Sequence, residues 1–143
     1  MASFRRIEAT DLYEMRARVV NAGIERTRPD FDGDDEPETR HYGYYLDDAI
    51  VCCATLMSAC WEGEAAWQLR GMATEPACRN QGLGARFLHA IESDILAHSD
   101  RRIVWCNARV AAIPFYERQG WRLMSEPFHI EAVGLHRKML KRL

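Results

Sequence analysis

The chain has 143 residues, of which 48% are hydrophobic, and it carries a formal net charge of −2 at pH 7. A chain of this length can bury a hydrophobic core without disulfides or a structural metal, so we expect one domain over residues 1–143. The small negative charge gives no general attraction to nucleic acid or anionic membranes, and neither is expected as a partner. Without an apolar run of about 18 residues or a secretory signal, the sequence predicts a cytoplasmic protein.

Five cysteines are present, and no two have the spacing of a zinc or dithiol motif, so no metal site is expected. They are Cys52, Cys53, Cys60, Cys78 and Cys106. We interpret them as reduced, mostly buried thiols. A catalytic thiol is the alternative for Cys52, Cys53 and Cys106, but their apolar surroundings favour a place in the core.

The N-terminal third predicts a strand, a helix and an acidic loop. Residues 4–8 fit an opening strand, and a helix start near Thr10 leads into apolar residues at helical spacing as far as Gly23. Residues 28–38 (RPDFDGDDEPE) combine acidic side chains with two prolines and a glycine. This composition is typical of a solvated loop, and the alternative is a segment that recognises a cationic ligand.

The middle of the chain is strand-like. Residues 41–46 lead through a turn into the apolar run 49–59, which predicts a hairpin that enters the centre of a sheet. A second turn at residues 62–64 leads into a strand over 65–74, and Glu75-Pro76 interrupts the pattern after it.

The C-terminal half alternates helices and strands. After Gly84, apolar residues every three or four positions predict a helix to about His98 with one face on a sheet. The remaining expected elements are a buried strand over 101–107, a short helix over 111–120, and two closing strands over 121–124 and 136–140. This order predicts an α/β domain with a mixed sheet and helices on its faces.

The segment Arg79-Asn80-Gln81-Gly82-Leu83-Gly84 lies between a predicted strand and a predicted helix. Its glycines would let backbone amides approach a ligand, and the helix start would add unpaired N–H donors, a combination that suits phosphate or pyrophosphate. An ordinary strand-to-helix turn is the alternative. The Walker pattern fails because Gly84 is followed by Ala85 and Arg86, and the dinucleotide pattern fails because Phe87 replaces its third glycine.

Three segments in order resemble the GNAT superfamily of N-acetyltransferases. Arg79, Gly82 and Gly84 fill its pattern Gln/Arg-x-x-Gly-x-Gly/Ala, residues 69–74 (LRGMAT) are similar to its fourth strand, and Asn107 with residues 113–121 (IPFYERQGW) is similar to its FYxxxGF/W helix. The resemblance is good over about residues 65–122. It implies a GNAT-like mixed, mostly antiparallel central sheet of about six or seven strands flanked by about four helices.

The resemblance also implies acetyl-CoA as the co-substrate, with no metal. The residues that it assigns to coenzyme binding are Met72, Ala73, Thr74, Arg79, Asn80, Gln81, Gly82, Leu83, Gly84, Ala85, Asn107 and Tyr116. Arg109 and Arg118 could reach the coenzyme phosphates, but we expect both to be solvated.

Two residues are expected to act in catalysis by this resemblance. The Met72 amide would lie near the thioester oxygen, where an N–H stabilises the oxyanion that forms when an amine attacks. Tyr116 would donate a proton to the departing thiolate, whereas its alternative role is packing beside Phe115. The implied reaction is direct acetyl transfer to an amine, with small molecules as the first choice of acceptor and no covalent acyl-enzyme.

No general base is singled out among His41, His129, Glu75 and Arg70 with Gln68, although His129 is the best of these candidates.

A non-catalytic acyl-CoA-binding regulatory or interaction domain is the leading alternative function, followed by a structural domain without a ligand. Apolar residues in the strands after Trp121 could pair across a two-fold axis, so a homodimer is left open.

Overall fold

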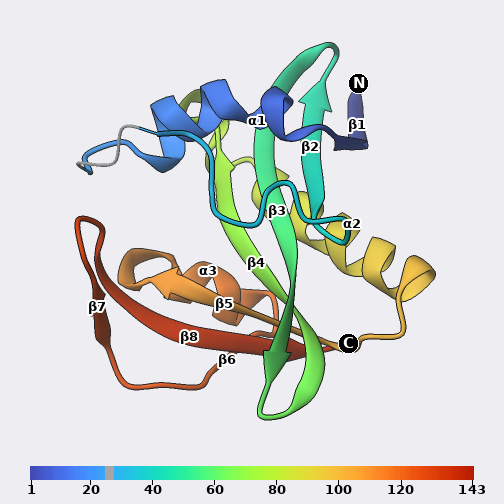
Figure 1. Cartoon of the computed structure of the whole chain (residues 1–143). Helices are drawn as coiled ribbons and strands as arrows, with labels where there is room; N and C mark the ends of the chain where they lie inside the picture. Colours follow the sequence, from blue (N-terminus) through green and yellow to red (C-terminus); the bar gives the residue numbers. More distant parts are fainter. Residues whose placement is uncertain (25–27) are drawn as a thin grey trace.

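The computed structural model describes residues 1–24 and 28–143, in which the chain forms eight strands of one sheet and three α-helices (Figure 1). The strands are β1 (Ala2–Ile7), β2 (Arg40–Leu46), β3 (Ala49–Trp61), β4 (Glu64–Thr74), β5 (Ile103–Arg109), β6 (Arg122–Leu123), β7 (Phe128–Ile130) and β8 (Gly134–Arg142). The helices are α1 (Ala9–Met15), α2 (Leu83–His98) and α3 (Ile113–Arg118), with a π-helical segment over Arg16–Val20. The expected α/β fold with a mixed, mostly antiparallel sheet is confirmed.

The element counts differ slightly from those expected. The extra strand is β7, which is only three residues long and therefore shows too little alternation to be recognised in the sequence. The first predicted helix does continue beyond Met15, but from Arg16 its winding widens to the π form and ends at Val20. This π-helical segment is not counted as an α-helix, so the described part of the chain has three α-helices rather than about four.

The sheet has the order β1-β2-β3-β4-β5-β8-β6, and β7 pairs with β8. The hairpins β2–β3 and β3–β4 are antiparallel, as predicted from their turns. Strand β5 pairs in parallel with β4, because α2 carries the chain across one face of the sheet before β5 begins. The main core lies beneath α2 and α3 and includes Leu69, Phe87 and Ile95. A smaller cluster around Leu12 and Cys53 covers the opposite face beneath α1.

The cysteines follow the prediction in outline. Cys52, Cys53 and Cys106 are buried, whereas Cys78 is half-buried and Cys60 is exposed, and all five are free thiols. Burial raises the pKa of the Cys52 thiol to about 11 and that of Cys106 to about 12. Such thiols carry little thiolate near neutral pH, which argues against a nucleophilic role.

Strands β4 and β5 are joined only at one end. Their paired residues are Trp67 with Val104 and Gln68 with Trp105. Beyond this point β4 continues to Thr74 along β3, while β5 continues to Arg109 along β8. The β5-facing backbone groups of residues 69–74 therefore have no strand partner, and this opening is the structural basis of the candidate site. No helix among the described residues is long and apolar enough to cross a membrane.

Candidate active site

A bulge on β4 lies beside the opening. The register with β3 shifts between Cys53 and Thr55, so that β4 holds one residue more than its partner. Gly71 sits in the bulge with a φ of +59°, and an added Cβ would lie 2.6 Å from a ring carbon of Phe31. Only glycine meets both conditions without strain. The bulge turns the following residues, so that Met72 packs toward α2 and Ala73 packs toward α1.

The predicted phosphate loop connects β4 to α2. Gly82 is the N-cap of α2, with a φ of +74°, and the space around an added Cβ is open. The first turn of α2 has no acidic residue and the cap has no side-chain hydrogen bond, so its backbone N–H groups face outward without an internal anion. Asn80, Gln81 and Gly82 are all exposed to solvent. This is the donor arrangement that binds phosphate at helix N-termini.

The loop is held against the end of β4 and against α3. An added Cβ at Gly84 would lie 3.3 Å from Thr74 Oγ1 and 3.4 Å from the Phe115 ring, which shows how closely the three segments pack. Arg79 is exposed, and its Nε donates a hydrogen bond of 3.2 Å to the Thr74 carbonyl oxygen. Residues 79–85, the end of β4 and α3 thus come together at one end of the opening.

Tyr116 reaches the opening from α3. Its hydroxyl lies 3.8 Å from Met72 Sδ on β4, and it also contacts the Cys106 thiol on β5. Its ring lies 5.1 Å from that of Trp121, so the residue has a packing role as well. Burial, followed by the influence of Cys106, raises the pKa of Tyr116 well above the usual value for a phenol. The side chain therefore stays protonated at neutral pH, the form that a proton donor requires.

Asn107 lies within β5 and on the other face of the sheet. Its neighbours Cys106 and Ala108 pack in the core beneath α2, so the alternation of the strand directs Asn107 away from that core. Its Oδ1 accepts a hydrogen bond of 3.0 Å from Lys138 Nζ on β8. The sequence prediction placed Asn107 at the end of its strand, but β5 continues for two more residues to Arg109.

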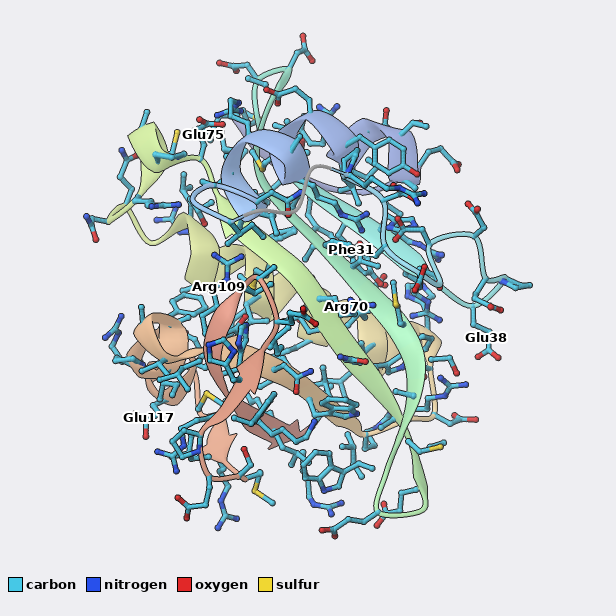
Figure 2. All side chains as sticks on the ribbon, turned by 60° about the vertical axis from the view of Figure 1, so that its left-hand side comes forward. Phe31, Glu38, Arg70, Glu75, Arg109 and Glu117 are labelled. Carbon is cyan, nitrogen blue, oxygen red and sulfur yellow. The ribbon has the colours of Figure 1, made fainter. Side chains whose placement is uncertain are left out.

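The base candidates are dispersed rather than gathered. His129 is exposed on β7, and Glu75 is bound to Arg18 through two hydrogen bonds. Gln68 occupies the last pair before the opening. Arg70 lies at the opening, with its guanidinium 4.9 Å from the centre of the Phe31 ring. Figure 2 shows Arg70 and Phe31 together on the face of β4.

The two arginines that we expected to be solvated are both exposed. Arg118 lies on α3, and Arg109 ends β5 on the other side of the opening from Arg70 (Figure 2). Arg109 also makes a contact within the protein. Its Nη2 donates a hydrogen bond of 2.6 Å to the Val20 carbonyl oxygen at the end of the π-helical segment. This bond links β5 to the element that lies over β4.

A buried polar cluster, which sequence reasoning missed, supports the opening from the α1 side. Arg16 is fully buried and donates to both carboxylate oxygens of Asp34, at 2.7 and 3.1 Å, and to Thr55 Oγ1 at 2.7 Å. His41, a base candidate, is buried here as well, 2.9 Å from Thr55 Oγ1 and 3.1 Å from the Asp34 carbonyl oxygen. The Arg16 guanidinium also lies 3.8 Å from the centre of the Phe31 ring. The cluster therefore fixes the acidic loop beside the bulge, and His41 has a structural role.

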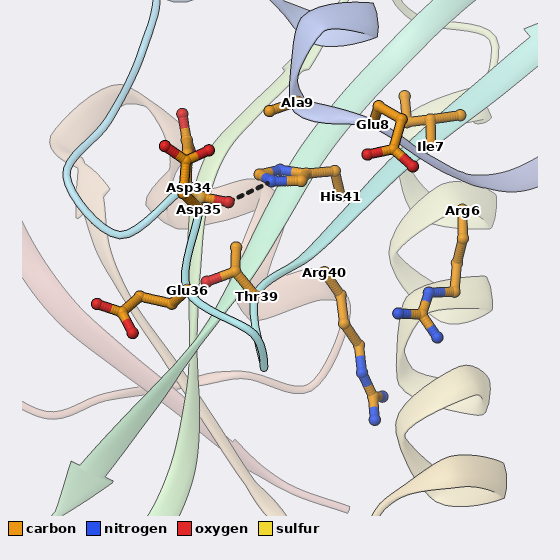
Figure 3. A pocket seen from close by; sticks show the side chains of 10 residues that line it. All are labelled: Arg6, Ile7, Glu8, Ala9, Asp34, Asp35, Glu36, Thr39, Arg40 and His41. Atoms are coloured by element: carbon orange, nitrogen blue, oxygen red, sulfur yellow. Dashed lines mark hydrogen bonds between the residues drawn. The ribbon is translucent and has the colours of Figure 1, made fainter.

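A cavity of about 330 Å³ lies on the outer side of this cluster (Figure 3). Arg6, Glu8, Arg40 and His41 are among the residues that line it. These residues belong to β1, β2 and the start of α1, and β2 is separated from β4 by β3. The cavity is consequently distinct from the opening between β4 and β5. In the described residues no group of three or more His, Cys, Asp or Glu side chains could hold a metal ion.

Comparisons with known proteins identify a family and similar folds. The family description "Acetyltransferase (GNAT) domain" matches residues 17–143. A protein of Bacillus subtilis (strain 168), named uncharacterized N-acetyltransferase YitI, is 30% identical over 146 residues, covering 100% of this chain and 97% of that protein. Among solved structures, Escherichia coli ElaA has a TM-score of 0.80 at 19% identity, covering 99% of this chain and 100% of ElaA. An aminoglycoside 6'-N-acetyltransferase solved with coenzyme A has a TM-score of 0.72 at 12% identity, with coverages of 98% and 96%.

Proposed function

Because the chain belongs to the GNAT family of acetyltransferases, we propose that it transfers the acetyl group of acetyl-CoA directly to the amine of a small-molecule acceptor. The observation that carries this proposal is the opening between β4 and β5, with the N-terminus of α2 and the Tyr116 hydroxyl both at its edge. The five free thiols favour action in the reducing cytoplasm.

The residues at the opening fit coenzyme A. The outward N–H groups of the first turn of α2, with open space at Gly82, suit the pyrophosphate. The strand groups of residues 69–74 that have no partner on the β5 side suit the amides of the pantetheine arm. When bound, acetyl-CoA supplies an activated acetyl group as a thioester.

The chain's own residues would supply two kinds of assistance. Backbone N–H groups near Met72 would stabilise negative charge on the acetyl oxygen, and the side-chain identity at this position would matter little. The Tyr116 hydroxyl would deliver its proton to the leaving sulfur. Holding the amine and the thioester together can contribute on the order of 7–11 kcal/mol in favourable systems, so no acyl-enzyme is needed.

Binding of acetyl-CoA is the first test. A ligand that binds only the folded state at 100 times its Kd adds roughly 2.7 kcal/mol of stability. We expect acetyl-CoA and CoA to raise the thermal unfolding midpoint, while ATP does not, and we expect thiol release when amines are added. Coenzyme binding without thiol release from a broad amine panel would instead support the non-catalytic acyl-CoA-binding alternative. No shift at millimolar acetyl-CoA would contradict the proposal.

A matched pair of glycine variants tests the phosphate loop. Gly82 and Gly63 both have a positive φ and open space at the Cβ position, but Gly63 lies in the turn between β3 and β4. Valine at either position should cost roughly 1–2 kcal/mol of stability, because a branched side chain is strained in that backbone region. Only Gly82→Val should weaken acetyl-CoA binding, by about tenfold or more, since it blocks approach to the α2 N–H groups. Equal coenzyme affinity in both variants, measured by calorimetry, would remove the loop from the binding site.

A further inference from the structure

A cationic side chain is fixed on the face of the opening that lies opposite the Tyr116 hydroxyl. Asn107 is directed to this face, and Lys138 Nζ donates to its Oδ1 at 3.0 Å. The same ammonium lies 4.6 Å from the centre of the Trp105 ring and 5.3 Å from that of Phe128. Trp105 is the last β5 residue paired with β4, so Lys138 is held at the point where the two strands separate.

The groups that the Lys138 ammonium contacts in the described residues are all neutral. In residues 1–24 and 28–143 its contacts are an amide oxygen and two aromatic rings, and no carboxylate forms an ion pair with it. An ammonium has three N–H donors, and only one of them is directed at Asn107. Lys141, on the same strand, shows the contrast, because its Nζ lies 2.8 Å from the Glu92 carboxylate. Lys138 therefore retains both charge and donors for a ligand.

Other cations extend this face. Arg109, at the end of β5, bonds to a carbonyl oxygen and forms no ion pair within the described chain. The Arg70 guanidinium lies against Phe31 on the β4 side, across the opening from Arg109 (Figure 2). Asp34 of the acidic loop is bound to Arg16, so it pairs with neither Lys138 nor Arg109. Glu38 of this loop is bound to Arg101.

A positive face has two effects on an acceptor amine. It disfavours a protonated or polycationic acceptor, because like charges repel at short range in a partly desolvated site. It also lowers the pKa of an ammonium bound there, which raises the share of the neutral amine that can attack the thioester. An acceptor with its own carboxylate gains a charge-assisted hydrogen bond from Lys138 and avoids the repulsion.

We infer that the acceptor is an amine that carries a carboxylate, as free amino acids do, and that the carboxylate binds to Lys138. The inference rests on the proposed acetyl transfer and names the substrate class of that site. It replaces the alternative in which the acidic loop recognises a cationic acceptor. Lys138 is a specificity residue in this scheme, and the chemistry at the thioester stays with the groups on β4 and α3.

The kinetic test compares acceptors that differ only in the carboxylate. Each amino acid is assayed beside its methyl amide, its decarboxylated amine and the polyamine spermidine, by thiol release from acetyl-CoA. We expect the amino acid to be preferred, and Lys138→Met to lower its kcat/KM about tenfold to a hundredfold through KM. The same variant should leave the decarboxylated amine unchanged or improve it. Lys138→Arg should retain the preference.

Arg142→Met is the matched control, because Arg142 lies on the same strand but is exposed and far from the opening in the register of β8. It should behave as the wild type. Equal or better use of spermidine or the decarboxylated amines by the wild type would overturn the inference while leaving acetyl transfer intact.

A binding measurement keeps the inference testable without turnover. N-acetyl amino acids, the products of such a reaction, and the N-acetyl derivatives of the decarboxylated amines are titrated calorimetrically into the wild-type protein with CoA present. Only the anionic products should bind, and binding should be lost in Lys138→Met. Absence of binding by every anionic product at 10 mM, roughly the limit of a weak site, would overturn the inference. Failure of CoA itself to bind would instead overturn the proposed function.

Discussion

Asp34→Asn is expected to lower the free energy of unfolding by about 3–5 kcal/mol, the usual cost of removing one partner of a buried ion pair. The asparagine can still accept the hydrogen bond that Phe31 N–H donates to Asp34 Oδ2 at 2.8 Å, so the change mainly removes charge. Arg16 would then remain fully buried beside Phe31 without its carboxylate. Urea unfolding followed by circular dichroism measures the difference.

The control is Asp35→Asn, because Asp35 is the exposed neighbour of Asp34. Its substitution should change stability by no more than about 0.5 kcal/mol. A loss below about 1 kcal/mol in Asp34→Asn would mean that solvent or another residue compensates Arg16, contrary to the burial seen here.

The Asp34 pair also predicts a pH dependence. Burial alone would raise the pKa of Asp34, but hydrogen bonds from Arg16 and the Phe31 N–H, together with the charge of Arg16, hold it below its usual range. A lowered folded-state pKa means that the stabilisation is fully present above the unfolded value, near 3.9, declines below it, and is lost as the pH falls through the lowered folded-state pKa. The stability of the wild type and of Asp34→Asn should therefore converge below about pH 4.

Tyr116→Phe is expected to reduce kcat by about 10²–10⁴-fold, the range for loss of a general acid, with little change in acetyl-CoA affinity. The ring packing against Trp121 and Phe115 is retained in the variant, so stability should change little. Steady-state kinetics and calorimetric titration of acetyl-CoA separate the two effects. Tyr44→Phe is the control, because Tyr44 packs against the same core beside Phe87 but lies on β2, two strands away from β4. An unchanged rate in Tyr116→Phe would leave Tyr116 with a packing role alone.

The raised pKa of Tyr116 sets the shape of the wild-type pH profile. Its proton stays in place through about pH 10, the ordinary phenol value, because burial disfavours the phenolate. The rate should rise with pH as the acceptor amine loses its proton, and it should show no decline from Tyr116 below that pH. Initial rates corrected for spontaneous thioester hydrolysis test this. A decline that begins near pH 8 would indicate a different acid.

The parts of the site that could be predicted from sequence are those formed by consecutive residues. Residues 79–84 join the end of a strand to the start of a helix, and local geometry alone makes such a junction a candidate for phosphate binding. Tyr116 could be assigned because it lies in a recognisable motif, and the structure places it beside Met72 on β4. The assignment of both residues to catalysis stays a prediction until it is measured.

The parts that could not be predicted depend on contacts between distant segments. Arg16 looks like a surface residue of a helix, and its burial requires Asp34 and Thr55, which are 18 and 39 residues away. The strand alternation over residues 134–142 could have placed Lys138 on one face, but not beside Asn107. That neighbour follows from the pairing of β5 with β8, a register that periodicity does not determine.

The separation of β4 from β5 also bears on the thermodynamics of ligand binding. Helix α2 connects the two parts of the sheet, since Asp94 binds Tyr42 on β2 while Glu92 binds Lys141 on β8. The two strands are already separate in the folded chain. A ligand that pairs with residues 69–74 gains hydrogen bonds without breaking a ladder, and the reorganisation that would otherwise weaken its affinity is completed when the chain folds.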